Sequence, residues 1–125
     1  MNYNEIEELV KSKLSLKRYN HTQAVLKLAS ELAAKNGENI ENAKLAAILH
    51  DITKEDSDEI QLQILKKSDI IFDDVTLKNN NLYHSVTAYL YAKNTLNIEN
   101  TDVLNAIYYH TTARENYLCF RFLRL

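Results

Sequence analysis

Four histidines and one aspartate are the residues of this sequence best suited to do chemistry together. The histidines are His21, His50, His84 and His110, and Asp51 directly follows the second of them. Each histidine falls on or beside the apolar face of a different predicted helix, and none is left over in a predicted loop. One histidine on such a face is most often an ordinary packed residue, whereas four are more simply explained by one shared site.

The chemistry of that site would be metal binding. Imidazole nitrogen and carboxylate oxygen together suit iron, manganese, zinc and similar divalent ions, and helical bundles build such sites from ligands that point inward from several helices. Cys119 is the only cysteine, so a thiolate cluster is not available. Adjacent ligands such as His50 and Asp51 can reach one ion if their helix ends there, and the carboxylate could also bridge two ions. A metal with an open position would acidify water into a nucleophile.

The elements that must position these residues are predicted to be helices. One glycine and no proline in 125 residues disfavour β-sandwich, dinucleotide-binding and P-loop folds, which need more turn glycines. Residues 69–81 show no clear period and are predicted to form a loop. Apolar spacing predicts six helices: one near Ile6, one from the N-cap Ser15 to Lys35, one from Ile40 to His50, one after a capping box of Asp56 and Glu59, one carrying His84, Ala88 and Tyr91, and one capped by Asn100 or Thr101 that reaches His110.

Length and composition limit the class of protein further. At 125 residues, with 46% apolar and 26% charged residues, the chain is expected to be one globular domain. The formal charge of -2 argues against a surface for nucleic acid, and no apolar run is long enough for a membrane span. The N-terminus is acidic and lacks the apolar core of a secretory signal. Together with the single cysteine, this predicts a cytoplasmic all-α protein.

Four local stretches resemble a known family. They are RYNHT (Arg18–Thr22), AAILHDITK (Ala46–Lys54), LYHSVTAYL (Leu82–Leu90) and AIYYHTTARENY (Ala106–Tyr117). Their order and spacing over residues 3–117 are similar to the HD-domain metal-dependent phosphohydrolase superfamily, and most of all to its YqeK-like members from Gram-positive bacteria. The resemblance implies an HD-domain helical bundle. It also implies a usually iron-dependent, symmetrical hydrolysis of diadenosine tetraphosphate to two ADP by metal-activated water.

The resemblance implies a role for each matching residue. His21, His50 and Asp51 match the family's metal ligands, with manganese or another transition metal as alternatives to iron, and Asp51, His84 and His110 form the implied catalytic group. His84 and His110 could contact phosphate oxygens, bind a second metal or protonate the departing ADP. Tyr83, Tyr108 and Tyr109 could stack on adenine, although such aromatics are more often core or rim residues. The positions implied to contact the nucleotide are Arg18, Lys54, His84, His110 and Thr111.

The end of the sequence departs from the family pattern. In the family a further helix supplies an aspartate that completes the metal site, whereas Tyr117–Leu125 contains no Asp, Glu or His. A frameshift or premature stop after about Asn116 would produce this pattern. We therefore expect residues 1–125 to form a single, C-terminally incomplete HD domain that lacks the last helices. The loss of the aspartate would lower the metal affinity. The apolar surface left exposed by the missing helices could be covered by a homodimer.

Three other functions compete with this hydrolase. The chain could be an impaired HD-fold fragment that binds metal or nucleotide without turnover. It could be an HD phosphohydrolase acting on another nucleotide. It could also be a helical interaction module whose histidines pack in the core, which the family-like stretches disfavour.

Overall fold

The chain is helical throughout the parts that the structure describes. The computed structural model describes residues 1–68 and 83–110, apart from the side chain of Tyr83, and within these ranges every regular element is a helix. The all-α prediction is therefore confirmed. The elements are α1 (Tyr3–Lys13), α2 (Leu16–Lys35), α3 (Ile40–Leu49), α4 (Asp58–Lys67), α6 (Tyr83–Leu90), the π-helical turn η2 (Tyr91–Thr95) and α7 (Thr101–Tyr109).

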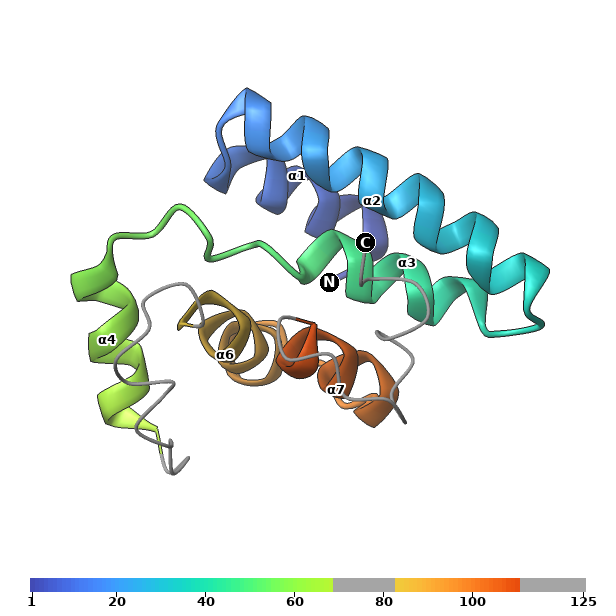
Figure 1. Cartoon of the computed structure of the whole chain (residues 1–125). Helices are drawn as coiled ribbons and strands as arrows, with labels where there is room; N and C mark the ends of the chain where they lie inside the picture. Colours follow the sequence, from blue (N-terminus) through green and yellow to red (C-terminus); the bar gives the residue numbers. More distant parts are fainter. Residues whose placement is uncertain (69–82, 111–125) are drawn as a thin grey trace.

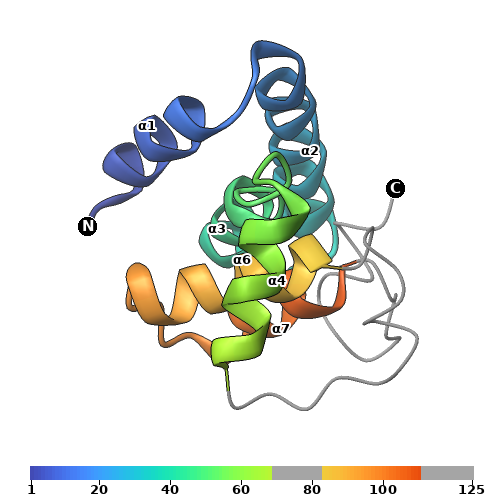
Figure 2. The ribbon, with the colours of Figure 1, turned by 90° about the vertical axis from the view of Figure 1, so that its left-hand side faces the viewer.

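Helix α3 lies in the middle of the bundle. It packs against α2 on one side and α7 on the other, and α1 lies across α2 and α3 (Figure 1). Helix α6 packs against both α7 and α4, so α4 lies at the edge of the bundle (Figure 2). Because α3 is packed between α2 and α7, the residues that follow it lie between these two helices.

Small residues allow the helices to approach closely. Alanines that are fully shielded from solvent lie on α2, α3, α6, η2 and α7, and larger side chains such as Ile48, Leu49 and Ile107 fill the space around them. A second apolar cluster, around Leu65 and Val86, joins α4 to α6. Because an alanine has no side chain beyond Cβ, the backbones that carry the histidines can come close together. The buried alanines are Ala29, Ala33, Ala43, Ala46, Ala47, Ala88, Ala92 and Ala106.

The helix starts confirm two predicted caps and correct one. The Ser15 side chain accepts a hydrogen bond from Arg18 N at 3.2 Å, and Asn100 accepts from Asp102 N and Val103 N. The predicted capping box at Asp56 is wrong, because the N-cap of α4 is Ser57, whose side chain accepts from Ile60 N at 3.2 Å. The Asp56 carboxylate instead pairs with Lys13 at 3.6 Å.

The helix of His84 is shorter than its apolar spacing predicts. Its regular part ends at Leu90, and Tyr91 begins the π-helical turn. Four predictions lie outside the described residues: the loop at 69–81, the stacking role of the Tyr83 side chain, the role of Thr111 and the departure at residues 117–125. Within the described ranges, no helix is both long enough and apolar enough to cross a membrane.

Candidate metal centre

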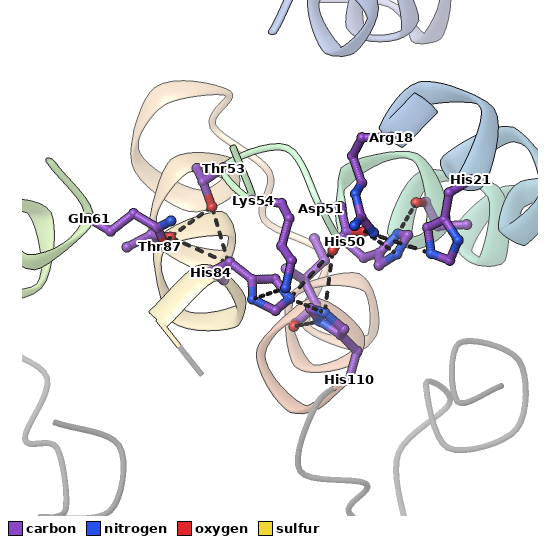
Figure 3. A network of polar contacts seen from close by, with 12 residues as sticks. Arg18, His21, His50, Asp51, Thr53, Lys54, Gln61, His84, Thr87 and His110 are labelled. Carbon is purple, nitrogen blue, oxygen red and sulfur yellow. Dashed lines mark hydrogen bonds and ion pairs between the residues drawn. The ribbon is translucent and has the colours of Figure 1, made fainter. Parts of the chain in front are cut away.

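Asp51 lies at the centre of the site, and its two carboxylate oxygens face different parts of the bundle (Figure 3). Oδ2 lies 3.3 Å from His50 Nε2 and 3.9 Å from His21 Nε2. Oδ1 lies 3.4 Å from His84 Nε2 and 3.9 Å from His110 Nε2. The four histidines that stand far apart in the sequence therefore converge on one buried carboxylate.

The ends of two helices deliver two of these histidines in the same way. His50 is the C-cap of α3 and His110 is the C-cap of α7. His50 Nδ1 lies 2.5 Å from the Ala47 carbonyl oxygen, and His110 Nδ1 lies 2.7 Å from that of Ile107. A carbonyl can only accept, so each Nδ1 carries the proton and donates to a carbonyl in the last turn of its own helix. Each Nε2 is then the unprotonated nitrogen, directed at Asp51 and ready to bind a metal.

His84 has the opposite arrangement of its ring nitrogens. Its Nδ1 lies 3.4 Å from Lys54 Nζ, and its Nε2 lies 3.1 Å from His110 Nε2. An ammonium group can only donate, so Nδ1 accepts and Nε2 carries the proton. The unprotonated Nε2 of His110 is a matching acceptor. The chain of contacts from Lys54 through His84 to His110 thus fixes the tautomers of both rings.

His21 is the exception to the predicted inner placement of the histidines. Its side chain is 51% exposed, whereas the buried positions of α2 are Thr22, Val25, Ala29 and Ala33. His21 therefore borders the buried face of α2 and reaches Asp51 from the rim of the site. A ligand at the rim leaves that side of the centre open to solvent and to a substrate.

Arg18 lies one helical turn before His21 on α2. Its Nη1 contacts Asp51 Oδ2 at 3.4 Å, and its side chain is 34% exposed. At this distance the contact is a long ion pair, and it is not bidentate. The guanidinium consequently keeps donors for another anion at the open side of the site.

The protonation states follow from burial and from the neighbouring rings. Burial by itself would raise the pKa of Asp51, but the side chain of His50, followed by those of His84 and His110, lowers it well below its ordinary value. Burial lowers the pKa of His110 to about 3, and His50 adds to this effect. Burial also lowers the pKa of His21, against the attraction of Asp51. Near neutral pH Asp51 is therefore ionised and the rings of His21 and His110 are neutral, which is the state that binds a metal.

These residues fit a divalent metal ion. In each of two groups, one ligand atom from every member lies within 4.8 Å of the others; the groups are His21, His50 and Asp51, and Asp51, His84 and His110. Ligand atoms about 2.1 Å from one ion are about 3 Å apart, so small side-chain movements would bring either group to ligation distances. The nitrogen and oxygen donors favour iron, manganese, zinc or cobalt over magnesium and calcium.

The site contains residues that the sequence did not single out. Thr53, Gln61 and Thr87 are buried and hydrogen-bonded beside His84. Thr53 lies inside the stretch that carries His50 and Asp51, but a threonine there has no chemical signature of its own. The predicted residues Arg18, His21, His50, Asp51, Lys54, His84 and His110 are all brought together.

Two of the three predicted aromatic residues, Tyr108 and Tyr109, pack against other apolar groups, and the side chain of Tyr83 lies outside the described residues. Tyr108 packs edge-on against Tyr89 and against Tyr109, with ring centroids 5.2 Å and 4.6 Å apart. Tyr109 also packs against the main apolar core. Both tyrosines thus have packing roles, and stacking on adenine stays a prediction.

Comparison with known proteins identifies the class that this fold and site define. The HD domain family matches residues 18–121. The chain therefore belongs to the HD domain family, and its metal-type centre of histidines around an aspartate is the feature that the resemblance predicts.

Individual relatives agree with that assignment. The chain is 37% identical over 117 residues to a protein named "Bis(5'-nucleosyl)-tetraphosphatase, symmetrical" from Halalkalibacterium halodurans, covering 93% of this chain and 62% of the relative. Proteins of the same name from Bacillus subtilis and Staphylococcus aureus are 36% and 31% identical, covering 91% and 92% of this chain and 61% and 59% of theirs. The chain thus spans about three fifths of the length of these relatives, and the predicted resemblance is confirmed.

A solved structure agrees as well. It is described as a predicted HD superfamily hydrolase involved in NAD metabolism from Clostridium acetobutylicum. The TM-score is 0.87 and the identity 32%, covering 94% of this chain and 62% of that one. The HD-type arrangement of the helices is therefore confirmed by fold as well as by sequence.

Proposed function

We propose that this chain is a metal-dependent phosphohydrolase that cleaves a dinucleoside polyphosphate, and specifically diadenosine tetraphosphate, to two ADP. The observation that carries the proposal is the buried, ionised Asp51, whose two oxygens each face two imidazoles. The names of the three curated relatives support the substrate class.

In this proposal His21, His50 and Asp51 hold one divalent ion. The ion would supply Lewis acidity toward a phosphate oxygen and toward the attacking water. His50 keeps its Nε2 unprotonated through the bond from Nδ1 to the Ala47 carbonyl. Asp51 is thereby assigned as the residue on which both ion binding and turnover depend.

The remaining predicted residues face the phosphates. Arg18 and Lys54 place two positive charges at the centre, which offset the charge of the polyphosphate chain. Water forms a bond to one inner phosphorus while the bond from that phosphorus to the central bridging oxygen breaks. The bridging oxygen leaves with the second ADP, and the attacking water loses its proton to solvent. The proton on His84 Nε2 is available to that oxygen, with His110 beside it. Thr111, which follows His110, is assigned to the substrate by its motif alone.

Finer parts of the proposal concern the ion and the setting. We infer iron as the native metal, with manganese able to replace it, because both suit the nitrogen and oxygen donors. We also infer that residues 1–125 act as one HD domain in the cytoplasm, either alone or as a homodimer. Metal analysis of the purified chain and analytical ultracentrifugation test the two inferences directly.

Incubation with diadenosine tetraphosphate tests the function. The chain, loaded with Fe²⁺ under argon or with Mn²⁺, should release ADP as the only nucleotide product, detected by anion-exchange chromatography. D51N should release none, whereas D102N, which removes an exposed carboxylate in the first turn of α7, should retain the activity.

The other outcomes separate the alternatives. AMP and ATP as products would contradict symmetrical cleavage. Stoichiometric metal without ADP would support a protein that binds metal but does not turn over this substrate. Two ions per chain would indicate that Asp51, His84 and His110 form a second metal site.

A further inference from the structure

A buried chain of hydrogen bonds lies directly behind His84 (Figure 3). Thr53 Oγ1 and Thr87 Oγ1 are 2.7 Å apart, and Thr87 Oγ1 donates to Gln61 Oε1 at 3.0 Å. Thr53 and Thr87 are fully shielded from solvent, and Gln61 is 3% exposed. These three residues come from the turn after Asp51, from α6 and from α4, and we name them the hydroxyl–amide network.

The network closes into a ring through the backbone. Gln61 Nε2 donates to the Asp56 carbonyl at 3.0 Å, so its Oε1 is the atom that accepts from Thr87. Thr87 gives its proton to Gln61, which leaves its oxygen to accept from Thr53. Asp56 N donates to the Thr53 carbonyl at 3.1 Å and completes the ring. The direction of each bond is thus set by its neighbour.

The ring is tied to the backbone of His84. The Thr53 hydroxyl has one proton, which it shares between Thr87 Oγ1 and the His84 carbonyl oxygen, 3.2 Å away. Thr87 Oγ1 lies 3.4 Å from the same carbonyl oxygen, but its proton goes to Gln61. Thr53 also stands between Asp51 and Lys54 in the sequence. The hydrogen-bonded ring therefore holds Lys54 through the turn that carries Thr53. It holds His84 through its backbone carbonyl in the first turn of α6.

Packing alone does not require these polar groups. Leu65, Val86 and Leu90 already form an apolar cluster between α4 and α6. A valine has nearly the shape of a threonine and would fill the same space. Hydrogen bonds differ from apolar contacts in being directional, so a satisfied buried network fixes one arrangement of the elements it joins.

We propose that Thr53, Thr87 and Gln61 are positioning residues that hold Lys54 against His84, and thereby set the direction of the His84 ring at the metal centre. The proposal concerns the site of the proposed function and rests on it for its catalytic meaning. It makes α4, which contributes no predicted ligand or substrate contact, part of the machinery of the site through Gln61.

Histidine NMR of the metal-free chain tests the proposal without any enzyme assay. Long-range ¹H–¹⁵N spectra report which ring nitrogen of His84 carries the proton. In the parent chain this should be Nε2. T53V and Q61M should both shift the His84 signals toward those of K54M, in which the donor to Nδ1 is missing, and T53S should restore the parent spectrum.

T22V is the matched control. Thr22 is also fully shielded from solvent, and its Oγ1 has no hydrogen-bond partner among the described residues. The same replacement there should leave the His84 signals unchanged. If T53V and Q61M lower thermal stability but leave the His84 signals as in the parent, the network has a structural role only and the proposal is overturned.

Cobalt binding gives a second, independent measure. His84 is not assigned as a ligand of the first ion, so T53V and Q61M, like T53S and T22V, should bind Co²⁺ about as tightly as the parent chain. A loss of about 10-fold or more, as is typical of residues that orient a metal ligand, would contradict the assignment of the network to His84. If the parent chain bound no Co²⁺ and released no ADP, the proposed function would fail. The His84 signals would still decide whether the network positions the ring.

Discussion

The four histidines are told apart by what each ring nitrogen contacts. His50 and His110 donate from Nδ1 to a carbonyl of their own helix and present an unprotonated Nε2. His84 accepts from Lys54 and presents a protonated Nε2. His21 reaches the same carboxylate from an exposed position. The same residue type therefore supplies two unprotonated Nε2 atoms, one N–H donor and one exposed ring at the rim.

Substitutions should distinguish the roles of the two candidate groups, His21, His50 and Asp51 on one side and Asp51, His84 and His110 on the other. D51N keeps the size of the side chain but removes the charge shared by both groups, and should weaken Mn²⁺ or Co²⁺ binding more than the 10–100-fold that is typical of an outer-shell change. H21Q should also weaken binding of the first ion. H84Q should affect turnover much more than the binding of that ion. Isothermal titration with Mn²⁺ measures the affinities. Equal losses of Mn²⁺ affinity in H21Q and H84Q would contradict the different roles of the two groups.

The stability of the metal-free chain should fall as the pH is lowered from 7.5 to 5. The pKa of His110 is lowered to about 3, below its ordinary value near 6.5. Between these values the unfolded chain binds the proton and the folded chain does not, so stability is fully present above pH 6.5 and is lost as the pH falls toward 3. For one such group the loss by pH 5 is about 2 kcal/mol. Urea unfolding in the presence of a chelator measures it.

H110N is the control for this pH effect. Asparagine does not titrate, and its amide can donate where Nδ1 donates to the Ile107 carbonyl. The variant should lose most of the stability difference between pH 7.5 and pH 5. Asp51 does not contribute to this window, because its lowered pKa affects stability only below its ordinary value near 3.9. An unchanged slope in H110N would contradict the assignment.

At the scale of elements, the C-terminal ends of two helices place residues of this site. Helices α3 and α7 each end at a histidine whose Nδ1 pairs with a carbonyl in the last turn of the same helix. After His50 the chain continues in tight turns, in which Lys54 N donates to the Asp51 carbonyl at 2.9 Å. A continuing helix would point His50 and Asp51 about 100° apart around its axis, so both side chains reach the centre because α3 stops.

The close approach of these helices should be sensitive to one added side chain. Ala47 is fully buried in α3, and its carbonyl holds His50. A47L should destabilise the chain by about 1–3 kcal/mol, because the packed interface has no room for the larger side chain. It should also weaken metal binding, because His50 moves with the helix. A34L, on the exposed face of α2, should change stability by less than about 0.5 kcal/mol. Urea unfolding compares the two variants.

At the scale of the whole molecule, Asp51 is the point where the two halves of the bundle meet. Helices α2 and α3 supply one pair of histidines, and α6 and α7 supply the other (Figures 1 and 3). A metal bound there would join elements that otherwise meet mainly through small apolar residues. The centre is thus expected to contribute to the stability of the bundle as well as to chemistry.

Metal should therefore raise the melting temperature of the chain. At a free Mn²⁺ concentration of 100 times the dissociation constant, the added stability is about 2.7 kcal/mol, which corresponds to about 10 °C for a domain of this size. EDTA should reverse the shift, and D51N should not show it. Differential scanning calorimetry with and without metal measures the change. A shift of the same size in D51N would place the stabilising ion elsewhere.

The sequence by itself determined the helical class, the cap at Ser15, the choice of Asn100 or Thr101 for the cap of the last helix, and seven of the site residues that the structure brings together. These features are local or chemical: apolar spacing sets helices, small polar side chains pair with nearby backbone N–H groups, and histidine beside aspartate marks ligands. The motif stretches also identified the family before any coordinates were considered.

Only the tertiary structure decided how those residues divide around Asp51. Apolar spacing gives the face of a helix to within about one residue, so it could not place His21 at the rim and the other histidines inside. It could not choose Ser57 over Asp56 as a cap, because both residue types can accept the same bonds. The network of Thr53, Thr87 and Gln61 joins three elements across the fold, and such pairings depend on distances in space that no local pattern in the chain records.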